Sequence, residues 1–461
     1  MILKIIMKRR ISLLCLLIPF LSGGIIVRGE TGSTPMDTIR ISRDECIEIA
    51  LQSNPTIKVA DMEVKRLDYS RKEVLGSLFP SIDFSMNYQR SIELQTMNMN
   101  MGGQSTQIKM GTDNTWNTGF SVAMPLVNAS LWKSIKLSDI QILTALEDAR
   151  GSRIELVNNI NKAYYSLQLA IASRDVILDN YRLAKETAEI YKKQFEQGTA
   201  SEYDVLRSEV QVSNVEPELL DADIAVKQCQ LQLKVLMGMD SKVEVWPTIG
   251  LKEMQEDMYS LAPGLDRSIA NNTGLRSLDI QRNLLDQTVK LRKMDFLPTL
   301  GAAFNINWTA LSNGNALRNQ TFNPYSMVGL SLSVPLFAGG RRYNALRQAK
   351  TSLAEIGFQR ENLVNSLNMQ VELAIDNINR QVRQIEASKR GMEQAVKAHS
   401  IMQKSFDIGA ASYLDLRDSE MAETRARLGY YQSIHTYLTS TSELDALLGK
   451  DYKVKKTTAT N

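Results

Sequence analysis

The feature that most constrains this chain is a long internal repeat. The stretch Phe195-Glu196-Gln197-Gly198-Thr199-Ala200-Ser201 returns 211 residues later as Phe406-Asp407-Ile408-Gly409-Ala410-Ala411-Ser412. Further matches at the same offset are Asp204 with Asp415, Glu209 with Glu420, and Leu236-Met237-Gly238 with Leu447-Leu448-Gly449. A repeat of this length is far longer than a solenoid unit. The chain is therefore expected to contain two similar half-molecules.

The repeat continues upstream with an altered spacing. Leu78-Phe79-Pro80 corresponds to Phe296-Leu297-Pro298 at an offset of 218, and Met124-Pro125-Leu126 corresponds to Val334-Pro335-Leu336 at an offset of 210. The two halves therefore differ in length by eight residues between their paired prolines, where a surface loop would absorb the difference.

The first 29 residues have the pattern of a secretory signal. A basic stretch (Lys4, Lys8, Arg9 and Arg10) precedes an apolar run over 11–20, and Val27-Arg28-Gly29 is a tolerable cleavage site. The apolar run is shorter than the roughly 20 residues that span a bilayer. We therefore predict an exported protein without a transmembrane helix. Cleavage removes five cations and no acid, so the formal charge of +3 becomes −2 and nucleic acid is not an expected partner.

Two cysteines would remain after cleavage. Cys15 leaves with the signal, and Ser12-Leu13-Leu14 before it is unlike the small-residue context of a lipid-modified cysteine. Cys46 and Cys229 both lie in helical patterns, which favours two buried free thiols. A disulfide between them stays open, because the distance between two thiols cannot be read from sequence.

The prolines indicate where long helices can run. None of the eleven lies between Pro125 and Pro217, and none follows Pro335. In the first gap, apolar residues recur at spacings of four and three, as in a coiled-coil seam. We predict long helices at about 131–197 and 341–408, and return helices at about 201–237 and 412–448. Gly198 and Gly409 would end the long helices, Ser201 and Ser412 would cap the return helices, and Pro217 would kink the first of these.

Between the paired prolines the apolar period becomes two. Strands are predicted at about 81–95, 114–126, 299–309 and 325–336, each with one apolar and one polar or small face. The apolar faces carry Phe84, Tyr88, Trp116, Phe120, Phe304, Trp308, Leu330 and Leu332. These strands could form a half-buried sheet of a soluble domain or a membrane barrel wall with these eight residues facing lipid. Strand length, aromatic residues near the strand ends and the export signal favour the barrel. Four strands cannot close a barrel, so several chains would have to share it.

Residues that carry catalytic or metal chemistry are scarce. The two histidines, His399 and His435, lie on helical patterns outside any metal-spaced set. Neither a phosphate-binding loop nor a dinucleotide motif is present, and the pair Gly339-Gly340 is weak support for one. The stretch Met97-Asn98-Met99-Asn100-Met101 is either an exposed loop or a soft-metal cluster, and the loop is favoured. We predict no enzyme, no cofactor and no metal site, with energy for transport supplied by a partner.

The repeat divides the chain into a signal (1–29), a first repeat (30–240), a linker (241–265), a second repeat (266–449) and a tail (450–461). Val334-Pro335-Leu336-Phe337-Ala338-Gly339-Gly340-Arg341-Arg342, the Phe-x-x-Gly-x-x-Ser-x-x-Asp stretches and the terminal Leu-Leu-Gly resemble the outer-membrane efflux protein family. The resemblance covers nearly the whole mature chain. It implies a mainly α-helical homotrimer with a twelve-stranded transmembrane β-barrel in the outer membrane of a Gram-negative bacterium and a periplasmic α-helical tunnel.

The resemblance implies a passive exit duct of a tripartite efflux pump. Its partners would be a periplasmic adaptor (membrane fusion protein) and an inner-membrane transporter, either a proton-driven pump or an ABC transporter, with outer-membrane lipid around the barrel. The outer-membrane channel of a type I protein secretion system is an alternative with the same duct. A periplasmic coiled-coil adaptor or scaffold is an alternative of another class, which leaves the four strands unexplained.

The resemblance also implies sites at the helix tips. The adaptor would dock on residues beside the two tip glycines, namely Phe195, Gly198, Ser201, Asp204, Val205, Phe406, Gly409, Ser412 and Leu416. Asp415 and Asp418 match an acidic entrance ring, whose mutual repulsion would raise the carboxyl pKa values; an exposed acidic helix face is the alternative. Phe406 and Ala411 stand where the family's best-known channel has a Tyr and an Arg that hold its entrance closed. Arg207 or Arg417 is therefore a candidate new partner for Asp204.

Overall fold

The structure is a computed structural model that describes residues 38–101, 104–240, 243–251, 253, 265–314 and 320–452. These residues belong to one compact unit, which starts at Thr38. The predicted signal, most of the linker and most of the tail lie outside the described residues. In the described part, no helix has an apolar stretch long enough to cross a membrane.

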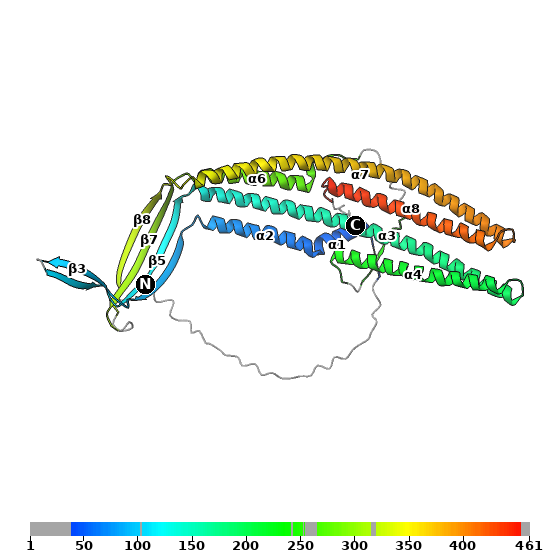
Figure 1. Ribbon diagram of the computed structural model, residues 1–461, viewed down its shortest axis with the longest axis horizontal. Coiled ribbons are helices and arrows are strands. Elements are labelled where there is room, and N and C mark those ends of the chain that lie inside the picture. Colours follow the sequence, from blue (N-terminus) through cyan, green and yellow to red (C-terminus); the bar gives the residue numbers. More distant parts are fainter. Residues whose placement is uncertain are drawn as a thin grey trace, which may run out of the picture. The chain divides into compact units, whose positions relative to one another are not determined.

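Each repeat contains a short helix, two strands and a long helical hairpin (Figure 1). The first repeat comprises α2 (Pro55–Gly76), β2 (Ser81–Arg90), β5 (Asn114–Val127), α3 (Ala129–Glu196) and α4 (Glu202–Met237). The second comprises α6 (Thr273–Met294), β7 (Thr299–Ser312), β8 (Asn323–Ser333), α7 (Arg341–Asp407) and α8 (Tyr413–Leu447). The remaining elements are β1 (Thr38–Ile41), α1 (Arg43–Ser53), β3 (Gln95–Met101), β4 (Gln104–Met110), β6 (Glu244–Pro247) and η1 (Ile269–Asn271), and β1 pairs in parallel with β6.

The long helices begin and end within two residues of their predicted bounds, whereas three strands differ more, among them β7, which ends at Ser312 instead of about residue 309. β2 ends at Arg90 instead of about residue 95, because the chain leaves the sheet to form the β3–β4 hairpin. The predicted loop of alternating Met and Asn residues is wrong, since this stretch is strand β3 and its alternation is a strand pattern. β8 ends at Ser333, two residues before Pro335, which has no N–H to donate to a ladder. α4 continues through Pro217 as one helix, and the predicted kink stays a prediction.

The four strands predicted from the period-two pattern form one antiparallel sheet in the order β2-β5-β7-β8. The register places Phe84 opposite Phe120 and Tyr88 opposite Trp116, with ring centroids 5.1 and 4.4 Å apart. Phe120 in turn lies 6.4 Å from Trp308. The same registers put all eight predicted lipid-facing residues on one face of the sheet.

The other face of the sheet is mostly polar or small, and Leu311, Tyr325 and Met327 are its large exceptions. Its β5 and β7 residues include Asn117, Gly119, Ser121, Asn305 and Asn307, and its one charged residue in the described sheet is Asp83 on β2. At Gly119 an added Cβ would lie 2.3 Å from the Asn307 side-chain oxygen. The glycine therefore allows a polar side chain to lie flat across the sheet.

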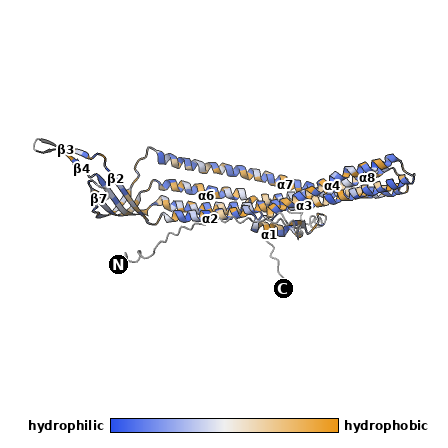
Figure 2. Cartoon of the chain, turned by 90° about the horizontal axis from the view of Figure 1, so that it is seen from below, coloured by the Kyte–Doolittle hydropathy of each residue, from blue (hydrophilic) through white to orange (hydrophobic). Residues whose placement is uncertain are grey.

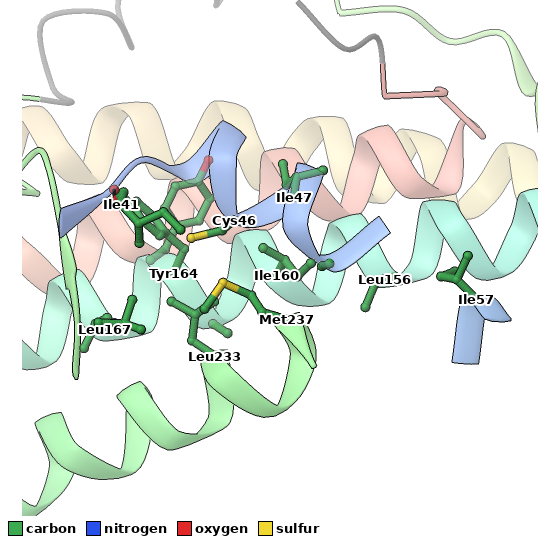
Figure 3. Close-up of a cluster of buried hydrophobic side chains, with 14 of the residues drawn as sticks. Ile41, Cys46, Ile47, Ile57, Leu156, Ile160, Tyr164, Leu167, Leu233 and Met237 are labelled. Carbon is green, nitrogen blue, oxygen red and sulfur yellow. Dashed lines mark hydrogen bonds between the residues drawn. The ribbon is translucent and has the colours of Figure 1, made fainter. Parts of the chain in front are cut away.

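Each repeat has its own buried core among the helices. The first joins Ile47 of α1 to Ile160 and Tyr164 of α3 and to Leu233 and Met237 of α4 (Figure 3). The second is built mainly from α7 and α8, and includes Val371, Ile375, Ile378, Tyr430, Ile434 and Tyr437. Cys46 is buried in the first core, and Cys229 is half-buried; both are free, which confirms the expectation of two free thiols.

Two equivalent asparagines tie the end of each return helix to the start of a short helix. The Asn54 amide donates to the Leu236 carbonyl, and the Asn272 amide donates to the Leu447 carbonyl, both at 2.7 Å. Each side-chain oxygen also caps its own helix by accepting from the backbone N–H of Thr56 or Leu275. These two bonds account for the repeated Leu-x-Gly, because the leucine of each stretch provides the carbonyl that accepts from the asparagine. A Cβ at Gly449 would lie 1.9 Å from the Asn271 carbonyl oxygen, so only glycine allows this approach.

We expect Asn272→Asp to lower the free energy of unfolding by about 1–3 kcal/mol, because a carboxylate can still cap α6 but cannot donate to the partly buried Leu447 carbonyl. The matched control is Asn128→Asp, since Asn128 caps α3 and its oxygen alone has a described contact. Chemical denaturation of the detergent-purified protein measures both. Equal stability of the two variants would show that the bond to Leu447 contributes little.

Candidate functional site

The two hairpin tips are the same turn built twice. Gly198 and Gly409 have φ angles of 72° and 75°, a left-handed conformation that glycine adopts without strain. The N–H of Gly198 donates to Phe195, and the N–H of Thr199 donates to Gln194, at 2.9 and 2.8 Å. The second tip repeats this pair of bonds at the same lengths. The repeated glycines therefore end the long helices with a Schellman motif.

The serine and aspartate of each tip form a capping box. The Ser201 hydroxyl donates to the Asp204 carboxylate at 2.6 Å, and Ser412 bonds Asp415 at the same distance. Both serines also accept from the backbone N–H of their aspartate. The repeated Ser-x-x-Asp is thus accounted for by helix capping.

The predicted entrance residues Asp415 and Asp418 are both exposed on the first turns of α8. The Ser412 side chain and backbone hold the pKa of Asp415 below its usual value, which opposes the predicted rise. This lowering is a property of one chain, whereas the rise depends on copies arranged around an axis. The ring therefore stays a prediction.

The predicted docking residues do not all reach the surface. Phe195, the tip glycines and the capping serines are exposed, but Leu416 is only 4% exposed and supports the tip from within. Leu416 is therefore wrong as a direct contact for a partner. The structure adds Tyr203, Leu206, Ile408 and Leu414, whose exposed fractions range from 51% to 80%. The repeat did not reveal these four, because only Tyr203 and Leu414 are equivalent and even they differ in type.

An aromatic cluster joins the two hairpins just behind their tips. Tyr191 of α3 lies 6.5 Å from Phe406 of α7 and 5.5 Å from Tyr413 of α8, measured between ring centroids. Phe406 and Tyr413 are 6.3 Å apart, and the Arg207 guanidinium of α4 lies 5.2 Å from the Tyr413 ring centre. All four long helices therefore contribute to one contact.

The cluster changes the interpretation of Asp204. Arg207 stacks on Tyr413, and within the described part of one chain neither Arg207 nor Arg417 forms an ion pair with Asp204, so the pairing stays a prediction for the assembled entrance. Burial raises the pKa of both Tyr191 and Tyr413, which therefore stay neutral at ordinary pH. The hairpins are held here by ring contacts and a cation–π contact, which are less sensitive to salt than an exposed ion pair.

We expect Tyr413→Ala to loosen the two hairpins from each other, because it removes two ring contacts and the cation–π contact with Arg207, each worth about 0.5–1.5 kcal/mol. Amide hydrogen exchange in 405–417 should become faster. Phe195→Ala is the control, because this exposed tip ring has no described aromatic contact. Exchange that is unchanged in Tyr413→Ala would contradict a holding role for the cluster.

The chain matches the outer membrane efflux protein family over residues 46–239 and 264–450, and it belongs to that family. It is 23% identical to the alkaline protease secretion protein AprF of Pseudomonas aeruginosa, covering 86% of this chain and 82% of AprF. It is 22% identical to the outer membrane protein TolC of Vibrio cholerae, covering 78% and 83%.

A solved structure has the same fold. The outer membrane channel CmeC of Campylobacter jejuni superimposes with a TM-score of 0.70 at 17% identity, covering 88% of this chain and 85% of CmeC. The resemblance stated from sequence is thereby confirmed. The chain is an outer-membrane efflux channel component of a Gram-negative bacterium and extends into the periplasm. The members of its family are channels and not enzymes.

Proposed function

We propose that three copies of this chain form the passive exit duct of a tripartite efflux pump. The observation that carries the proposal is the open sheet. β2 and β8 are its edges, and every residue of both strands is exposed. Unpaired edges are not tolerated in lipid, so each β2 would pair with the β8 of a neighbouring copy to close twelve strands.

The helices support the same assembly. Along α4, exposed residues recur at an interval of seven: Tyr203, Val210, Pro217, Ile224 and Leu231. Leu206 and Leu220 lie between them in the same register. Such spacing is typical of a coiled-coil seam, and in one chain this seam has no partner. Figure 2 shows that apolar residues are spread along the length of the helices. A second copy would cover the α4 seam.

In the closed barrel, the aromatic and aliphatic face would contact lipid and the polar face would line the duct. The side chains of the polar face are mainly Ser, Asn, Gly and Ala, and Asp83 is the one charged residue per copy on this face of the described sheet. A nearly neutral wall favours passage of diverse solutes over binding of one. The exposed apolar residues of the tips would be the docking surface for a periplasmic adaptor. An inner-membrane transporter would supply the energy for export.

The outer-membrane channel of a type I protein secretion system is the second candidate. The relationship to a protein named for protease secretion, over 86% of this chain, favours it. Both functions use the same duct. Copurification of the adaptor with either a proton-driven pump or an ABC transporter separates them.

The proposal predicts ion-conducting trimers whose selectivity depends on the entrance. Asp415→Asn with Asp418→Asn should weaken the preference for cations over anions, because the threefold axis would bring six carboxylates around one opening. Asn is chosen because it still accepts the capping bond. Asp407→Asn, at the exposed end of α7, is the control. Reversal potentials in planar bilayers measure the preference.

Unchanged selectivity in a double variant that still conducts would place the acidic ring elsewhere. Failure of the unmodified protein to form channels, together with a monomeric mass in detergent, would overturn the duct itself.

A further inference from the structure

Glu420 of α8 is partly buried, unlike its equivalent in the first repeat. Glu209 stands at the matching position of α4 and is exposed. Oε1 of Glu420 is shielded from solvent and has no hydrogen-bond partner among the described residues. Since buried polar atoms are usually paired, an unpaired carboxyl oxygen in one repeat alone calls for an explanation.

The carboxyl lines a small polar cavity between α8, α3 and α7, and α8 packs against both of these helices. The cavity has a volume of about 120 Å³. The polar and charged residues that line it are Asp179 and Asn180 of α3, His399 of α7, and Glu420, Glu423, Thr424 and Arg427 of α8. In the described part of the chain, no three acidic, His or Cys residues lie close enough to bind a metal ion.

The surroundings of Glu420 offer little to a negative charge. Arg427 is paired with Glu423, and Oδ1 of Asn180 is a second buried acceptor without a described partner. His399 Nδ1 lies 3.3 Å from the Ser419 hydroxyl. Acceptors and acids therefore outnumber free donors around the cavity.

Arg417 is the cation best placed to compensate, yet it does not pair with Glu420. It lies three residues earlier on α8, and its Nε is buried without a described partner. The two side chains are within electrostatic range but form no ion pair in the described structure. The Arg417 guanidinium therefore does not neutralise a charge on Glu420 through a direct ion pair.

Burial raises the pKa of Glu420 to about 7; Arg417 opposes this shift and Glu423 adds to it. A protonated carboxyl needs no compensating cation, and its O–H can donate to a neighbouring acceptor.

We propose that Glu420 is a proton-sensitive contact, which holds the α7–α8 hairpin against α3 when protonated and loosens it when ionised. A carboxyl with a raised pKa in the packed arrangement binds its proton more tightly there than when exposed to water. Lower pH therefore favours packing. Between the ordinary value of 4.5 and about 7, the balance shifts toward the loosened arrangement by up to about tenfold per pH unit.

Hydrogen exchange of the assembled, full-length mature protein in detergent tests the proposal. After correction for the intrinsic rate, exchange in 413–427 should accelerate more than tenfold between pH 5 and pH 8, because pH 5 lies near the lower end of the range over which the balance shifts and pH 8 lies above its upper end. Glu420→Gln, which stays neutral, should keep slow exchange throughout. Glu209→Gln is the matched control and should behave as the unmodified protein does. His399→Gln should also keep the pH dependence. This variant tests whether His399, the titratable group that α7 contributes to the cavity, causes the effect instead.

The proposal is overturned if Glu420→Gln retains the acceleration, if His399→Gln alone abolishes it, or if the unmodified protein shows none. Infrared difference spectra of the unmodified protein provide a readout that does not depend on the folding of a variant. The carbonyl band of a protonated carboxylic acid should be present at pH 5.5 and lost by pH 8. Absence of this band at pH 5.5 would also overturn the proposal.

Discussion

The unpaired edges of one four-stranded sheet are the constraint on which the rest of the structure depends. β2 and β8 each present a full row of backbone donors and acceptors, beside a face of aromatic and aliphatic side chains. Water could satisfy the backbone but would not favour the apolar face, and lipid would favour the face but not the backbone. Pairing between copies satisfies both. We therefore infer from the chemistry of the sheet that the chain works as an oligomer, as proposed above.

The duplication supplies the rest of the architecture from few devices. Each repeat contributes two strands to the sheet and one long hairpin to the helical part. The tip of each hairpin is set by a left-handed glycine and a capping box. The other end is set by Asn54 or Asn272, which joins a return helix to the short helix that leads into the sheet. These devices are local, so a duplicated sequence yields a duplicated structure.

The two repeats diverge where they contact each other. The Tyr413 ring of the second hairpin contacts the Arg207 guanidinium of the first, and Glu420 is partly buried where Glu209 is exposed. Both of these departures from repeat symmetry lie in the tip half of α8. We infer that these residues tune how firmly the hairpins pack, while the symmetric residues fix the fold.

Sequence reasoning succeeded where structure depends on local chemistry. Gly198 and Gly409 marked the helix ends, and the period-two pattern placed the strands of the sheet and their faces. It failed where a contact joins distant segments. The bond from Asn272 to Leu447 and the stacking of Arg207 on Tyr413 span 175 and 206 positions, and no local pattern announces them. The burial of Leu416 was likewise hidden, because neither Leu416 nor its repeat equivalent Val205 indicates which face of the return helix packs inward. The β3–β4 hairpin was missed because Met and Asn suggested a loop although they alternate.

Disulfide crosslinking between the sheet edges tests the central claim most directly. Ser85→Cys on β2 is combined with Met327→Cys, Gly329→Cys or Ser331→Cys on β8, in a chain whose Cys46 and Cys229 are replaced by Ala. Within one chain these positions are separated by β5 and β7, about 14 Å at the usual strand spacing, which is too far for a disulfide. The account predicts covalent dimers and trimers on a denaturing gel for at least one pair. Monomers alone from every pair, in protein inserted in the outer membrane, would contradict it.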